Sequence, residues 1–429
     1  MAWPLLRERH RSRKQTGQTM GHRTMSLPLP KLFFYSQPSW SLGALRHSLG
    51  LADSLSQSFR VTLVLGSPIP KGIVAPANVL VRELPAATLA DDGGIQTLDR
   101  RRDLDQTLVL RRDKLLDLFA STSPEVLLVD RFPLELITLA SELVPLINAA
   151  LASNTVPVMA CSVRSPDDVG EPAFVDQDTL ELLNSCFDML LVHTDPSHVN
   201  IQDRSPEAMN LPVQILHTGF VDVSELDSRS TPAPPNPTPE LLVSGGNGHD
   251  SAKLLKLAAL EHGRLWREEG LETRIVTGPS ISEEDWKELR HLTRSSRHVK
   301  LQRSVENLVP LLNQAQVVVG EAGFNASLDV LQNSTPAVII PRRQPGGSQT
   351  RRARRLEQEG QAVVVEPWQL DGKSLLKAVQ KARYNNPPEL GYNMEGGSTT
   401  TRILREYLTN CSSLDKEARS ASRTGASGR

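Results

Sequence analysis

Three glycine-containing segments lie where a predicted strand passes into a predicted helix, and each could bring its backbone close to a phosphate group. They are Ser244–His249 (SGGNGH), Val276–Pro279 (VTGP) and Val319–Asp329 (VGEAGFNASLD). Glycine permits close backbone approach, and a helix N-terminus offers unbonded N–H groups and a positive dipole end. The first two segments are equally well explained as tight turns. The third is the stronger signal, because Gly320 and Gly323 bracket a loop that could hold a diphosphate.

Two polar side chains beside these loops could bind a sugar. Asp329 falls about one turn into the helix after Gly323, where its carboxylate could accept from ribose hydroxyls. The alternative is a solvated position on that helix. Gln349, after the loop that begins at Ile340, could bind sugar hydroxyls. Nearby arginines could bind phosphate, although such a run predicts mainly a solvated helix face: Arg342, Arg343, Arg351, Arg352, Arg354 and Arg355.

Asp130 is the candidate general base. It follows the apolar run Val126–Val129, so it is expected at the carboxyl end of a buried strand, pointing into a cleft, where a base could reach an acceptor hydroxyl. The alternative is an acid that caps the next segment. Asp103-Leu-Asp105 lies in a charged helical stretch and is read as a solvated face. The ten histidines form no HxxxH pair, so no metal site is predicted.

The elements that must position these residues alternate regularly. Apolar runs of four to six residues, such as Val126–Val129 and Met189–Val192, are separated by helical segments, which is typical of a parallel sheet covered on both faces. The run SRSTPAPPNPTP at 228–239 has five prolines and predicts a linker. The rhythm then restarts. We therefore expect an α/β protein with two doubly wound, Rossmann-like domains that face each other across a cleft, where ligands bind at the carboxyl ends of the strands.

The predicted organisation has five parts: a disordered basic extension (1–30), an N-terminal acceptor domain (31–227), the proline-rich linker (228–239), a C-terminal nucleotide-sugar domain (240–411) and a disordered tail (412–429). In the extension, six basic residues face Glu8 alone. Contact with anionic lipid and a transit peptide are two functional readings of it; a solvated, unstructured extension is the reading that such runs favour.

Composition narrows the class of protein. The chain has 429 residues and a formal net charge of −1, which gives no overall field to gather nucleic acid. No window of about 20 apolar residues predicts a membrane span. The three cysteines are far apart and form no CxxC pair, as expected for a cytoplasmic protein. Peripheral contact with the inner membrane through the basic extension is compatible with this location.

The ordered set of motifs GGNG, VTGP, GEAGFNASLDVL and PAVIIPR resembles the C-terminal domain of the MurG-like glycosyltransferases, and it looks closest to a bacterial branch of predicted glycosyltransferases. The segment Tyr35–Arg46 resembles a loop of that branch. The resemblance runs from about Leu32 to Tyr407. It implies the GT-B fold and inverting, metal-independent transfer of a sugar from a nucleotide-sugar, usually UDP-linked, to an unidentified acceptor. The nucleotide-sugar would be a co-substrate, with no further cofactor.

The same resemblance implies the site. Residues Gly320 to Asn325 would hold the diphosphate, Asp329 the ribose and Gln349 the donor sugar, with Thr277 and Val305 near the base. The full set of expected ligand-binding residues is Gly43, Arg164, Gly245, Gly246, Asn247, Gly248, Thr277, Gly278, Val305, Gly320, Glu321, Ala322, Gly323, Phe324, Asn325, Asp329, Arg342 and Gln349.

The chain departs from the family at several positions. It has Ala44 where the family has a loop histidine, Ser165 where the branch often has aspartate, and Asp329 where glutamate is usual. His47 lies three residues after Ala44 and is expected to face away. These departures motivate one alternative, a catalytically weak GT-B protein that binds a nucleotide-sugar or a partner without turnover. A second alternative is a nucleotide-sugar hydrolase or epimerase on the same fold.

Overall fold

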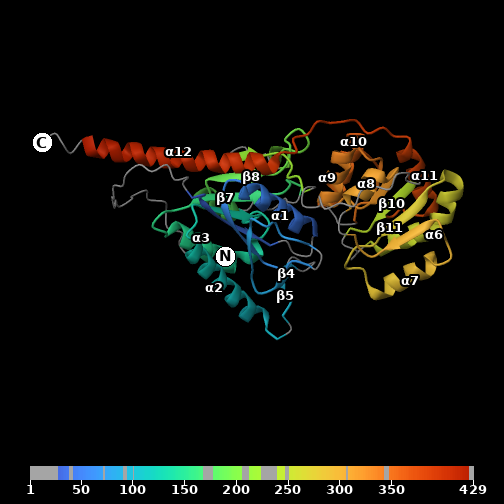
Figure 1. Cartoon of the computed structure of the whole chain (residues 1–429), viewed down its shortest axis with the longest axis horizontal. Coiled ribbons are helices and arrows are strands. Elements are labelled where there is room, and N and C mark those ends of the chain that lie inside the picture. Colours follow the sequence, from blue (N-terminus) through green and yellow to red (C-terminus); the bar gives the residue numbers. More distant parts are fainter. Residues whose placement is uncertain are drawn as a thin grey trace.

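The computed structural model of the chain contains two α/β domains that lie side by side (Figure 1). It describes residues 28–37, 42–70, 73–89, 94–99, 101–167, 177–204, 212–223, 239–246, 251–305, 308–342 and 347–424, without the side chains of 203–204 and 412–424. The predicted extension, up to residue 27, and the linker residues 228–238 lie outside these ranges.

The first domain is built on a seven-stranded parallel sheet of order β3-β2-β1-β6-β7-β8-β9. Its strands are β1 Lys31–Ser36, β2 Arg60–Leu65, β3 Leu80–Glu83, β6 Val126–Asp130, β7 Val158–Val163, β8 Met189–Val192 and β9 Gln214–His217. The other elements are α1 Leu42–Ser56, the hairpin β4 Ala87–Leu89 and β5 Ile95–Thr97, α2 Leu104–Thr122, η1 Ile137–Leu139, α3 Ala140–Leu151, α4 Gln177–Cys186 and α5 Ile201–Arg204.

Both faces of this sheet are buried, which explains the continuous apolar runs. Helices α2, α3 and α4 cover one face, where Phe119, Leu143 and Leu182 pack on the strands. Helix α1 covers the other face together with α12, Gly396–Thr424, the last helix of the chain.

The second domain has a six-stranded parallel sheet of order β12-β11-β10-β13-β14-β15. Its strands are β10 Glu240–Ser244, β11 Glu272–Val276, β12 Val299–Gln302, β13 Val317–Gly320, β14 Ala337–Ile339 and β15 Ala362–Val364. Its helices are α6 Ala252–Glu269, α7 Glu283–Thr293, α8 Val309–Gln314, α9 Phe324–Asn333, α10 Ser348–Gln358 and α11 Gly372–Arg383. The predicted doubly wound architecture is confirmed in both halves. The strand order reverses between β1 and β6 and again between β10 and β13, and such switch points are where this class of sheet binds ligands.

The end of the chain differs from the prediction. Residues 412–424 belong to α12 and are helical, so the prediction of a disordered tail from Ser412 is wrong for them. Helix α12 also leaves the second domain: the chain crosses back (Figure 1), Gly396 donates its N–H to the carbonyl of Phe220, and Leu404 is buried in the core beneath α1. The second domain therefore ends before Gly396, not at Cys411. Among the described residues, no helix is long and apolar enough to cross a membrane.

If α12 is part of the first domain, Leu404→Ala should destabilise that domain by about 2–5 kcal/mol, the usual cost of truncating a buried leucine. Amide hydrogen exchange should accelerate in α1 and β2 and stay unchanged in β10 and β13. Arg402→Ala, at a side chain that is 61% exposed on the same helix, is the matched control. Unchanged exchange in α1 for Leu404→Ala would contradict this domain assignment.

Candidate functional site

The switch point of the second sheet brings the strongest sequence signal into one place. The loop Gly320–Gly323 leaves β13, and α9 starts at Phe324 with Gly323 as its N-cap residue. The first N–H groups of a helix have no intrahelical partner and form its positive end. Gly323 has a φ of −61° and a ψ of 153°, which any residue can adopt. Among the described residues, no atom lies within 4 Å of a Cβ added there. Neither the backbone conformation nor packing against the described residues therefore requires glycine here, and these residues leave the space beside Gly323 open to a ligand.

The neighbouring glycines after β10 are explained by the fold itself. A Cβ on Gly245 would come within 2.5 Å of the carbonyl oxygen of Thr277 and 2.7 Å of Ser251 Oγ. Gly246 has a φ of +58°, in the left-handed region that favours glycine. Asn247 and Gly248 lie outside the described residues. A role of this turn in phosphate binding stays a prediction.

The segment after β11 is also used within the protein. The hydroxyl of Thr277 is buried and donates to the carbonyl of Arg303 at 3.1 Å. Gly278 has a φ of +93°, which closes the turn. Val305 packs against an apolar cluster that includes Leu242 and Val276. These contacts place the three residues at the carboxyl edge of the sheet without assigning them a ligand.

The loop after β14 joins the loop after β13. The guanidinium of Arg342 donates to Glu321 at 2.6 Å, and its backbone N–H donates to the side-chain oxygen of Gln349 at 3.1 Å. Asp329 lies in the second turn of α9, partly buried, and its carbonyl accepts from Asn333. Three of the predicted positions, Glu321, Arg342 and Gln349, are thus joined by hydrogen bonds at the ends of β13 and β14. Asp329 lies further along α9, six residues after Gly323.

The first domain meets this loop directly. A Cβ on Gly43, at the start of α1, would lie 3.2 Å from Cγ of Asn325. The guanidinium of Arg164 lies over the ring of Phe324, 4.8 Å from its centroid. The structure therefore brings the predicted residues Gly43 and Arg164 of the first domain against the N-terminus of α9.

His47 also contacts this junction, so the expectation that it faces away is wrong. Its ring is buried and meets Phe324 edge to face, with centroids 6.1 Å apart, and it lies 5.2 Å from the ring of His193. With a rotation of about 100° per residue along α1, position 47 lies on the side of the helix that faces the second domain.

His193 directly follows β8, and no motif in the sequence predicted it as a site residue. Its two ring nitrogens are hydrogen-bonded, to Ser162 Oγ at 2.8 Å and to Thr218 Oγ1 at 2.9 Å. Burial lowers the pKa of His193 to about 3, so it is neutral at physiological pH. Its uncharged, hydrogen-bonded ring packs against the ring of His47.

Asp130 occupies the predicted strand end but lies inside a polar chain. Its carboxylate is 6% exposed, accepts from Ser36 Oγ at 3.0 Å and pairs with Arg131 at 3.3 Å. Ser36 is bonded in turn to Ser48 of α1 at 2.8 Å. In this arrangement Asp130 ties the ends of β1 and β6 to α1. Both contacts are made by Oδ2, so among the described residues Oδ1 keeps lone pairs that an acceptor hydroxyl could use.

The arginine run on α10 is not simply a solvated face. Asp167 of the first domain, 1% exposed, accepts from Arg355 at 2.5 and 3.3 Å, and its carbonyl accepts from Arg351 at 2.5 Å. Arg352 is buried, whereas Arg354 is 50% exposed and pairs with Glu357 and Glu366. The interpretation as a solvated face holds for Arg354 and is wrong for Arg351, Arg352 and Arg355; Arg343 lies outside the described residues.

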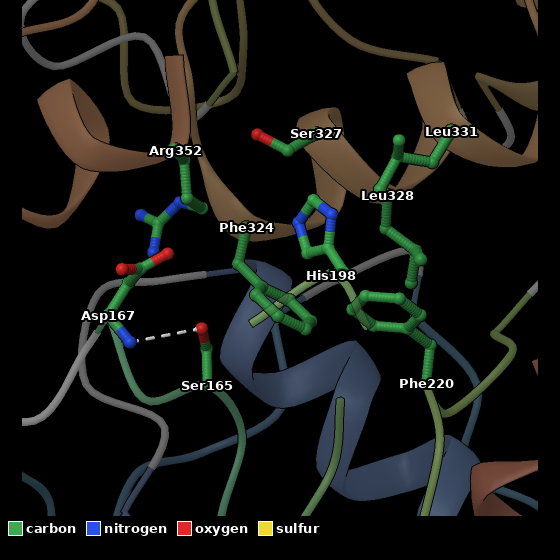
Figure 2. A pocket seen from close by; sticks show the side chains of 9 residues that line it. All are labelled: Ser165, Asp167, His198, Phe220, Phe324, Ser327, Leu328, Leu331 and Arg352. Atoms are coloured by element: carbon green, nitrogen blue, oxygen red, sulfur yellow. Dashed lines mark hydrogen bonds between the residues drawn. The ribbon is translucent and has the colours of Figure 1, made fainter. Parts of the chain in front are cut away.

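A small pocket lies between the domains (Figure 2). Asp167 and His198 line it from the first domain, and Phe324, Ser327 and Arg352 line it from the second. Its volume is about 10 Å³, room for one water molecule. Beside it, His198 contacts Glu359 at 2.9 Å across the domain boundary. The sequence offered no local signal for Asp167 or His198, because their partners lie more than 150 residues away.

Comparison with known proteins connects this geometry to a family. Residues 241–404 match the family model described as the glycosyltransferase family 28 C-terminal domain. Over 148 residues the chain is 26% identical to the UDP-N-acetylglucosamine–N-acetylmuramyl-(pentapeptide) pyrophosphoryl-undecaprenol N-acetylglucosamine transferase of Leuconostoc mesenteroides, a match of 34% of this chain and 40% of that protein. The chain thus spans about two fifths of the length of this relative.

The fold is similar over nearly the whole chain. The calicheamicin glycosyltransferase CalG4 matches with a TM-score of 0.54 and 16% identity, covering 93% of this chain and 100% of its own. MurG of Acinetobacter baumannii matches with a TM-score of 0.50 and 12% identity, covering 88% and 100%. The predicted GT-B fold and the predicted resemblance to MurG-like glycosyltransferases are confirmed.

Proposed function

We propose that this MurG-like GT-B protein transfers a sugar from a nucleotide-sugar, UDP-linked, to an acceptor hydroxyl. The observation that carries the proposal is the open, glycine-lined N-terminus of α9 at the switch point, within a domain that matches a glycosyltransferase family model. The curated relative uses UDP-N-acetylglucosamine by name, which favours uridine as the base. The acceptor is unidentified.

The proposed reaction is an inverting displacement. The acceptor oxygen attacks the anomeric carbon, the bond from that carbon to the diphosphate oxygen breaks, and the acceptor proton passes to Asp130. The leaving diphosphate gains negative charge at the N-terminus of α9, where the N–H groups of Gly323 to Asn325 and the helix dipole stabilise it. This stabilisation is the reason we propose transfer without a metal ion.

In the proposed complex, Asp329 binds the ribose and Gln349 the donor sugar. Asp329 lies on the same helix as the diphosphate site, one to two turns further on, so one rigid element positions both contacts. Gln349 opens α10 and is already oriented by Arg342. Arg164 and Gly43 close the site from the first domain.

Asp329→Ala should weaken UDP binding about ten- to hundredfold, because a hydrogen bond to a charged group contributes roughly 1.5–3 kcal/mol. Titration calorimetry with UDP on the wild type and the variant measures this. Glu288→Ala, at a surface acid on α7 that is 49% exposed, is the control and should bind UDP normally. Equal affinities for wild type and Asp329→Ala, or no UDP binding by either, would remove the residue-level support for a uridine donor.

Two other functions fit the same fold. A protein that binds a nucleotide-sugar without turnover is motivated by Ala44 and Ser165. A hydrolase or epimerase would convert the nucleotide-sugar with no acceptor present. Incubation with the donor alone separates the epimerase or hydrolase from the transferase, and binding without any turnover selects the first alternative.

A further inference from the structure

Arg352 lies directly behind the loop after β13. Its Nε donates to the carbonyl of Ala322 at 3.0 Å, and its Nη2 donates to Ser348 Oγ at 3.1 Å. The residue is 6% exposed. Figure 2 shows it reaching down from α10 on the side of the pocket opposite Leu331. Burying a charged guanidinium costs desolvation free energy. Its hydrogen bond to a main-chain carbonyl of this loop therefore indicates a specific role there.

The bond to Ala322 sets the direction of the next N–H. In a planar trans peptide the C=O and the N–H point to opposite sides. With the carbonyl of Ala322 held by Arg352, the N–H of Gly323 points away from α10. Within the described residues no hydrogen bond is made by this N–H, and the space beside Gly323 is open. This N–H is therefore available to a ligand on the side of the loop that faces away from α10.

The other arginines of α10 act elsewhere. Arg351 and Arg355 bind Asp167 of the first domain, and Arg354 pairs with acids on the surface. Gln349, three residues before Arg352 and so on the same helix face, accepts from the N–H of Arg342. One face of α10 thus holds both the loop after β13 and the loop after β14.

We propose that Arg352 is a positioning residue, which orients the Ala322–Gly323 peptide so that its N–H can bind a diphosphate. The inference rests on the proposed function for the identity of the ligand. It predicts a loss confined to the diphosphate part of the ligand, because Arg352 bonds the carbonyl of Ala322 in the loop after β13 and Ser348 of α10.

The test compares UDP, uridine and inorganic pyrophosphate by titration calorimetry on the full chain. Arg352→Met keeps an unbranched, apolar side chain about as long as the aliphatic stem of arginine and removes the hydrogen-bond donors. It should raise the Kd for UDP and for pyrophosphate roughly ten- to hundredfold, the effect of losing one hydrogen bond to a charged group. The Kd for uridine should change less than about twofold. Arg352→Lys, which retains a donor, should recover most of the lost affinity, and Arg354→Met on the same helix should behave as wild type.

The outcomes separate this inference from the proposed function. An equal loss of UDP and uridine affinity would show that Arg352 supports the domain as a whole and would overturn the positioning role, as would wild-type affinity for pyrophosphate in Arg352→Met. If the wild type binds pyrophosphate but not UDP, the uridine donor is wrong, and the pyrophosphate titration of Arg352→Met still decides the role of Arg352. A wild type that binds neither ligand overturns both.

Discussion

Asp130→Asn should slow sugar transfer by about 100- to 10,000-fold, the usual contribution of a positioned general base, with little loss of stability. An amide cannot take the acceptor proton. Its carbonyl oxygen can still accept from Ser36 and Arg131, so the polar chain that joins β1, β6 and α1 is retained. The measurement is the release of nucleoside diphosphate from the donor, together with the melting temperature and the affinity for UDP.

This substitution separates a catalytic role of Asp130 from a structural one. Asp130 is nearly buried and paired with Arg131, so a purely structural role is the competing explanation. A structural role predicts a lower melting temperature at an undiminished turnover rate per folded molecule. Ser36→Ala is the matched control, because it removes a partner of Asp130 and keeps the carboxylate. If Asp130→Asn turns over at the wild-type rate, the base must be another group of the cleft.

Gly323→Val should abolish UDP binding, with a rise in Kd of about 100-fold or more. A branched side chain would fill the open space beside the N-terminus of α9 and separate the diphosphate from at least two N–H donors, each contributing roughly 1.5–3 kcal/mol. The φ and ψ of Gly323 suit valine, and in the part of the chain that the structure describes no atom lies within 4 Å of the new Cβ. The variant should therefore fold, with only the small loss expected at an N-cap position.

Gly263→Val is the control for this substitution. Gly263 lies on α6, and none of the described atoms lies within 4 Å of a Cβ added there. It is about 18 Å along the helix, at a rise of 1.5 Å per residue, from the N-cap Ser251 at the end of α6 nearest the strand ends. It should bind UDP normally. Undiminished UDP binding by Gly323→Val would show that the diphosphate lies elsewhere.

The order of strands and helices was predictable because its signals are local. In runs such as Met189–Val192 and Val317–Val319 every residue is apolar, which indicates a strand whose two faces are both covered. The segment VGEAG between a predicted strand and a predicted helix likewise predicted the loop at Gly320–Gly323. Since parallel strands joined by right-handed crossovers have few arrangements, this local order also indicated the edge at which the candidate site lies.

The partners of individual side chains could not be predicted, because they come from distant parts of the chain. The arginines of α10 look alike in sequence. Only the packed structure places Asp167 against Arg355 and the carbonyl of Ala322 against Arg352, and leaves Arg354 in solvent.

The same holds for the faces of α1 and for the last helix. His47 faces the second domain and Leu404 of α12 fills the core under α1. A repeating pattern of apolar residues determines that a helix forms and which stripe is buried, but it carries no record of what buries it. By itself the sequence determined the fold and the loops that surround the candidate site; tertiary contact decided which polar side chains lie at that site, since burial and pairing depend on neighbours that the local chain does not contain.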